Sequence, residues 1–170
     1  MSDAGVLPVP VVYIADRTVL TPPELVYGYR QGWLSDADVV ALALAAYQQG
    51  PVPAAEEELA LLLSDDLDRV PDLIDELEAD GETAEGGEAR GVWLYLALAW
   101  LYEHRSEVPD PLGVVEMLFA DFDYPLEIAG IVRFMPVPPG EPTGSVAVEN
   151  RWRAYLDHKA QQYASRRSSA

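Results

Sequence analysis

The chain has 170 residues, of which 49% are apolar, and it carries a formal net charge of −18. This length suits one domain with a sizeable core, and this apolar share excludes an intrinsically disordered chain. The charge opposes binding to nucleic acid and to anionic membranes, and the absence of cysteine excludes disulfides and thiolate metal sites. No signal peptide is recognisable and no apolar run approaches the roughly 20 residues that span a bilayer, so we expect a cytoplasmic protein.

Proline and capping signals predict the first elements. Residues Val6 to Ile14 are β-branched and interrupted by prolines, so a short extended segment is expected there. Thr21 and the acid three residues later form the pattern of a capping box, which predicts a helix from Pro22 to Gln31. A second box begins at Ser35 and is followed by an apolar stripe at helical spacing, which predicts a helix from Asp36 to Gln49.

Two more helices are expected in the acidic middle of the chain. Pro53 predicts a helix to Leu63 that carries Leu59, Leu62 and Leu63 inward. Its first turn holds Glu56 to Glu58, where carboxylates favour the helix dipole. A turn at Ser64 to Arg69 and a fresh helix from Pro71 to Ala79 follow, because proline does not continue the preceding helix. A Gly- and Glu-rich loop is expected from Asp80 to Gly87.

The C-terminal half is dominated by one apolar segment. Residues Glu88 to Glu107 are apolar on nearly every face, which predicts a helix buried among others. A helix from Pro111 to Ala120, an aromatic turn at Asp121 to Pro125, a short helix to Phe134 and a final helix from Ser145 follow. We expect an all-α fold, an irregular multi-helix bundle around the apolar helix, as one domain over residues 1–165 with a disordered tail at 166–170.

Carboxylates are concentrated between Ala54 and Glu88, where fourteen acids face a single base, Arg69, to give a local net charge of −13. Such a run is commonly a solvated surface that maintains solubility. It also suits a basic partner, because guanidinium groups bind carboxylates and phosphates in the same bidentate manner. The residues placed on this candidate surface are Asp68, Asp72, Asp75 and Glu76.

Aromatic residues near the start of the chain offer a second candidate contact. Tyr29 and Trp33 are either part of an apolar core stripe or exposed anchors for a partner. The sequence leaves both interpretations open.

Signals for catalysis are weak. His104 and His158 are the two histidines, and neither lies in a recognised catalytic or metal-binding motif. Asp121 and Asp123 flank an aromatic residue and could bind a divalent ion or share a proton, with His104 as a possible third group. The simpler interpretation is that the two acids belong to a tight interhelical turn.

Several short motifs resemble a family of small uncharacterised bacterial proteins over about Val19 to Pro136. These motifs are Tyr27-Gly28-Tyr29-Arg30-Gln31-Gly32-Trp33-Leu34, Trp93-Leu94-Tyr95, Asp110-Pro111-Leu112, Ala120-Asp121-Phe122-Asp123-Tyr124-Pro125 and Arg133-Phe134-Met135-Pro136. Members of such families often occur as immunity proteins beside polymorphic or contact-dependent toxins. The resemblance implies a toxin as partner and transfers no active site.

The sequence therefore predicts an immunity-type protein that is not an enzyme, needs no cofactor or metal, and covers the active cleft of a basic toxin, with a nuclease as the best fit. A metal- or ligand-dependent protein using Asp121 and Asp123 is the first alternative. A structural module that only oligomerises is the second, and the sequence does not define an oligomeric state.

Overall fold

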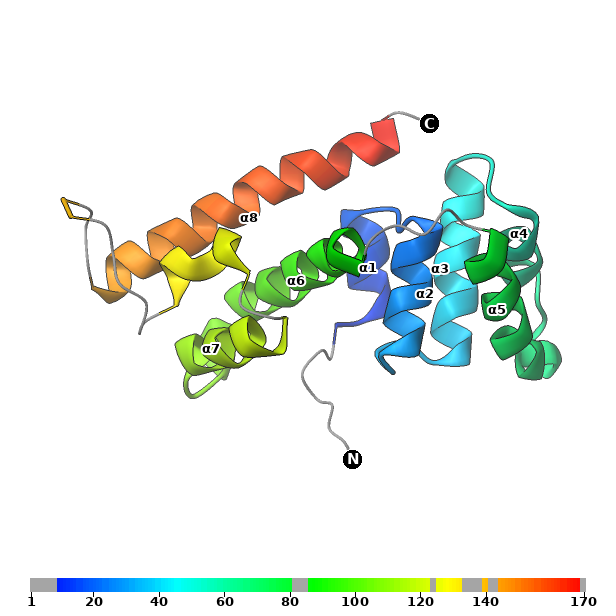
Figure 1. The fold of residues 1–170 in the computed structure, drawn as a ribbon, viewed down its shortest axis with the longest axis horizontal. Helices are drawn as coiled ribbons and strands as arrows, with labels where there is room; N and C mark the ends of the chain where they lie inside the picture. Colours follow the sequence, from blue (N-terminus) through cyan, green and yellow to red (C-terminus); the bar gives the residue numbers. More distant parts are fainter. Residues whose placement is uncertain (1–8, 81–85, 123–124, 133–138, 141–143, 169–170) are drawn as a thin grey trace. The chain divides into compact units, whose positions relative to one another are not determined.

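The computed structural model describes residues 9–80, 86–122, 125–132, 139–140 and 144–168 (Figure 1). Every regular element in these ranges is an α-helix or a 3₁₀-helix, which confirms the all-α prediction. Contacts divide the chain into two compact units: unit 1 comprises Met1–Trp93 with Tyr163–Ala170, and unit 2 comprises Leu94–Gln162. The boundary falls inside two helices, α6 (Gly86–Glu103) and α8 (Ser145–Ser168).

The first helix of unit 1, α1 (Val11–Arg17), corrects the expectation of an extended segment over Val6 to Ile14. Pro10 stands at the N-cap in an extended conformation, so the prolines precede the helix and do not interrupt its hydrogen bonds. Ile14 is completely buried, and that packing outweighs the modest β preference of its branched neighbours. Residues 6–8 of the expected segment lie outside the described ranges.

Capping boxes start the next two helices where the sequence places them. In α2 (Pro22–Arg30) the Thr21 hydroxyl accepts a hydrogen bond from the Glu24 amide at 3.4 Å, and the Glu24 carboxylate accepts one from the Thr21 amide at 2.9 Å. In α3 (Asp36–Gln49) Ser35 and Asp38 make the same pair of bonds at 3.1 and 3.0 Å. Both boxes are confirmed, and they fix where each helix begins.

The acidic segment forms α4 (Ala54–Ala60), η2 (Ser64–Arg69) and α5 (Val70–Asp80). Figure 1 shows α2, α3, α4 and α5 lying side by side within unit 1. The prediction that the helix beginning at Pro53 reaches Leu63 is wrong, because in α4 the backbone leaves the helical conformation at Leu61. Leu59 is buried as expected, whereas Leu61 and Leu63 are 57% and 69% exposed.

A buried tryptophan of α6 joins the core of unit 1. The indole N–H of Trp93 donates to the carbonyl of Glu24 on α2 at 2.9 Å, and the ring lies directly against Gly28. A Cβ at Gly28 would lie 2.2 Å from the indole, so only glycine permits this approach. The Trp93 ring and the missing side chain at Gly28 explain why α2 packs so closely on this part of α6.

Unit 2 contains the rest of α6, η3 (Arg105–Glu107), α7 (Pro111–Asp121), η4 (Leu126–Ile131) and most of α8. The apolar helix is buried on nearly every face, as predicted. Trp152 of α8 is fully buried, donates its indole N–H to Leu98 at 3.2 Å, and meets the Tyr102 ring edge-on at 5.1 Å. The α8 helix continues to Ser168, into the segment expected to be a disordered tail.

The remaining loop predictions are tested only in part. The helix expected from Pro125 to Phe134 is a shorter 3₁₀-helix ending at Ile131. Most of the expected loops at Asp80 to Gly87 and Met135 to Gly144 lies outside the described residues, although α5 includes Asp80 and α6 begins at Gly86.

Candidate partner-binding surface

Exposed carboxylates gather on α4, η2 and α5 of unit 1. The buried side chains of α5, Leu73, Ile74 and Leu77, direct the acids of that helix to the outside. The exposed acids of these three elements are Glu57, Glu58, Asp65, Asp68, Asp72, Asp75, Glu76 and Glu78. We call this set the acidic surface.

All four sequence-predicted acids belong to the acidic surface. Asp72, Asp75 and Glu76 are exposed on α5, and Asp68 is exposed in the preceding 3₁₀-helix. The predicted division of α5 into an acidic outer side and an apolar inner side is therefore present in the structure.

Arg30 of α2 is a partner of the acidic surface that the sequence analysis missed. Its guanidinium donates to Asp75 at 2.6 Å and to Glu78 at 2.7 Å. These hydrogen bonds raise the pKa of Arg30, so the group remains charged. Asp75 is thus already paired within the chain, while a second pair joins Arg69 to Glu58 at 3.0 Å.

Tyr29 lies close to the acidic surface but its hydroxyl is engaged. The side chain is half-buried, and its O–H donates to Asp36 at 3.0 Å. Burial raises the pKa of Tyr29, and the hydrogen bond to Asp36 and the nearby charge of Asp75 raise it further. Tyr29 therefore stays a neutral hydroxyl that is bonded to the first residue of α3.

Trp33 belongs to an aromatic cluster and not to the acidic surface. It is half-buried between Tyr27 and Trp93, with ring centroids 5.7 and 5.4 Å apart. Its position favours the core interpretation over the exposed-anchor interpretation, because its ring already packs on two aromatic neighbours.

Leu61 and Leu63 supply exposed apolar area between two elements of the acidic surface, and of these two the sequence had placed Leu63 in the core. Both lie in the connection between α4 and η2: Leu61 is three residues after exposed Glu58, and Leu63 is two residues before exposed Asp65. Protein interfaces combine apolar centres with polar rims. These leucines are better placed than Tyr29 or Trp33 to serve as apolar anchors.

Glu56 departs most from its predicted place. It was expected to be exposed in the first turn of the predicted helix from Pro53 to Leu63. In the structure it is only 1% exposed, and burial raises its pKa to about 7. The signal that could have found it is helical spacing, since Glu56 lies three and four residues before buried Leu59 and Ala60.

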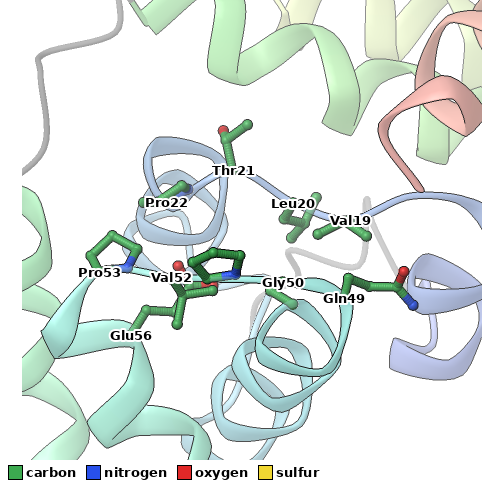
Figure 2. A pocket seen from close by; sticks show the side chains of 11 residues that line it. Val19, Leu20, Thr21, Pro22, Gln49, Gly50, Val52, Pro53 and Glu56 are labelled. Carbon is green, nitrogen blue, oxygen red and sulfur yellow. The ribbon is translucent and has the colours of Figure 1, made fainter. Parts of the chain in front are cut away.

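Glu56 lines a pocket in unit 1 with a volume of about 420 Å³ (Figure 2). One wall is the segment 19–22 that leads into α2, and the other is the segment 49–53 between α3 and α4. Figure 2 shows Glu56 rising from α4 beside Val52 and Pro53. The lining is mainly apolar, and among the described residues that form it Glu56 alone is ionisable.

The alternative site around the aromatic turn gains no support from the described part of unit 2. Asp121 is exposed at the end of α7, and Asp123 lies outside the described residues. The His104 ring stacks on Trp100 with centroids 3.8 Å apart, and its Nδ1 lies 2.8 Å from the Trp100 carbonyl oxygen. Across the described ranges, no three His, Asp or Glu side chains are grouped as metal ligands.

In the described part of the chain, no helix is both long enough and apolar enough to cross a membrane.

The comparisons with known proteins identify a family. No curated protein and no solved structure is detectably similar to the chain. Residues 12–160 match the family model described as an uncharacterised protein conserved in bacteria, DUF2247. Since this match covers most of the sequence, the chain belongs to this bacterial family.

Proposed function

We propose that the chain is an immunity-type protein that binds and neutralises a cognate bacterial toxin, with a basic nuclease as the best-fitting partner. The observation that carries this proposal is the acidic surface on α4, η2 and α5. An excess of exposed carboxylates attracts a basic protein and speeds its diffusional encounter.

The chemistry of the acidic surface suits a nuclease cleft. A nuclease meets phosphates with arginine and lysine, and carboxylates accept the same charge-assisted hydrogen bonds. Asp68, Asp72 and Glu76 can take the places that phosphates would occupy in the cleft, while Asp75 can exchange its bond to Arg30 for one to the partner. Blocking the cleft in this way needs no catalytic group.

Apolar contacts would hold the complex after electrostatic encounter. Surface charge mainly raises association rates, whereas desolvated apolar anchors slow dissociation. Leu61 and Leu63 are exposed within the acidic surface and provide this contact. The proposed interface therefore has an apolar centre and an acidic rim.

Nucleic acid is not the proposed partner. A net charge of −18 opposes the counterion release that drives non-specific binding. At about 150 mM salt, where the Debye length is ~8 Å, we expect no gel shift of duplex DNA or RNA. Saturable binding under these conditions would remove the basis for a phosphate-mimicking surface.

The direct test is inhibition of a toxin domain encoded beside this gene. We expect its nuclease activity to fall in proportion to added protein and to vanish near equimolar ratio. The double variant Leu61→Ser and Leu63→Ser should dissociate faster and inhibit less, while its helix content stays unchanged. Full activity of the toxin in the presence of excess folded protein, or the absence of any adjacent toxin gene, would refute the proposal.

A further inference from the structure

The pocket between segments 19–22 and 49–53 contains a buried carboxyl group that lacks a hydrogen-bonding or ionic partner among the described residues. Glu56 is 1% exposed and lines the pocket, and no hydrogen bond or ion pair of its carboxyl is found among the described residues. A buried carboxylate without a partner is unfavourable, because it loses water and gains no compensating bond. Such a group either keeps a proton or receives a cation from outside.

We propose that this pocket binds a primary alkylammonium group, carried by a free amine or by a lysine side chain, with the ammonium paired to Glu56 and the aliphatic stem along the apolar walls. The volume of about 420 Å³ lies within the usual range for ligand sites. The inference goes beyond the proposed function and does not depend on it.

The lining favours a slender amphipathic cation over other ligands. Val19, Leu20 and Val52 offer apolar surface to a methylene chain, and three prolines stiffen the walls. An anion would be repelled by Glu56 and by the net charge of −18, whereas a neutral ligand would leave the carboxylate unpaired. A primary ammonium has three donors for a carboxylate and for neighbouring carbonyl groups.

Binding is expected to release a proton. Burial raises the pKa of Glu56 to about 7, so near neutral pH the carboxyl is protonated in about half of the molecules. An ammonium ion favours the carboxylate form, so the proton leaves Glu56 for the buffer as the ion pair forms. The ligand itself stays protonated, because an alkylammonium pKa lies above 10.

The ionisable groups of the surrounding helices do not account for this behaviour. On α3, Tyr47 donates to Glu57 at 3.5 Å, and on α4, Glu58 pairs with Arg69. The carboxylate of Glu24 on α2 bonds back to Thr21. The acids of α5 and η2 that belong to the acidic surface are exposed to water. Burial is therefore the cause of the raised pKa of Glu56.

The test uses the whole purified chain and n-pentylammonium chloride in calorimetric titrations at pH 6, 7 and 8. The expected affinity rises about tenfold from pH 6 to pH 8, because the ionised fraction of a group with a pKa near 7 rises by that factor. Titrations in two buffers with different ionisation enthalpies should show release of about half a proton per ligand at pH 7.

Two variants and one neutral analogue complete the experiment. Glu56→Gln should lower the affinity for n-pentylammonium at pH 8 at least about tenfold, since it removes the paired charge. Glu57→Gln, the same change at an exposed neighbour, should alter it less than about twofold. Uncharged 1-pentanol should bind more weakly than n-pentylammonium to the wild-type protein.

The source of the ammonium group is distinguished by a lysine peptide. Tighter binding of acetyl-Gly-Lys-Gly-amide than of n-pentylammonium would assign the pocket to a lysine of a protein partner, and the reverse order would assign it to a small amine. Either result supports the binding of an ammonium group in the pocket, whether or not a toxin partner exists. Affinity that is independent of pH and equal for n-pentylammonium and 1-pentanol would overturn the proposal, even if Glu56→Gln failed to fold.

Discussion

Replacing Gly28 by alanine should destabilise the protein, although alanine is the better helix former. The new Cβ would lie 2.2 Å from Cζ2 and 2.8 Å from Cε2 of Trp93. The indole is buried and held by its hydrogen bond to Glu24, so it moves only by losing packing or that bond. Overpacking costs about 1–3 kcal/mol, while the gain in helix propensity is about 1 kcal/mol. We expect a net loss of up to about 2 kcal/mol in the free energy of unfolding, toward the upper end because the indole has little room to move.

Gly91→Ala is the matched control. Gly91 also lies within a helix of unit 1, but a Cβ there would be 3.5 Å from the Tyr163 hydroxyl, an ordinary contact. This variant should gain up to about 1 kcal/mol from helix propensity alone. The assay is urea unfolding followed by far-UV circular dichroism.

The two alanine variants should differ in stability by about 2 kcal/mol. In a Trp93→Phe background the penalty of Gly28→Ala should shrink, because the smaller ring leaves room for the methyl group. A Gly28→Ala variant as stable as Gly91→Ala would refute the close packing of α2 on Trp93.

Three further predictions concern stability. Because the folded-state pKa of Glu56 is raised from 4.5 to about 7, stability should fall as pH rises from about 4.5 to 7; Glu56→Gln should remove up to about 3 kcal/mol of this dependence, measured by urea unfolding at pH 4.5 and 8. Arg30→Gln should cost at most about 1 kcal/mol, since its pairs are exposed, and the loss should shrink in 1 M salt. Ser35→Ala should cost about 1 kcal/mol and Ser35→Gly only a few tenths, checked by thermal melts.

Local signals account for the elements that the sequence predicted well. A capping box closes within four residues, so Ser35 and Asp38 define the start of α3 without help from the rest of the fold. The continuous apolar run of α6 likewise indicated a helix buried on all sides.

Tertiary contacts decide the elements that the sequence placed wrongly. The β-branched residues of α1 are held in a helix by burial of Ile14, which propensity does not reveal. The end of α4 at Ala60 exposes Leu63, although the helical spacing alone placed it beside Leu59. Glu56 was predicted to be exposed because it is charged, and this was wrong; its spacing before buried Leu59 and Ala60 was the signal for its burial.

On the candidate surface, local spacing in the sequence predicted which acids are exposed, whereas ion pairs between residues distant in the sequence could not be predicted. The spacing of Asp72, Asp75 and Glu76 on one helix was enough to predict their exposure. The bonds of Arg30 to Asp75 and Glu78 join residues 45 and 48 positions apart, and no local pattern encodes such pairs.

Steering of a basic toxin by the acidic surface is tested with a variant that carries Asp72→Asn, Asp75→Asn and Glu76→Gln, the acidic triple variant. Exposed substitutions of this kind change stability by less than about 0.5 kcal/mol each, so the fold should be retained. Association with the cognate toxin domain is measured by stopped flow between about 10 and 150 mM salt, over which the Debye length falls from ~30 to ~8 Å.

The control variant carries Glu103→Gln, Glu107→Gln and Asp157→Asn, exposed acids of unit 2 with the same total change in charge. We expect the acidic triple variant to associate at least about tenfold more slowly than wild type at low salt, with a flatter salt dependence, while the control stays within about threefold of wild type. Equal rates for the two variants would contradict steering by the acidic surface, which would then act only through net charge or not at all.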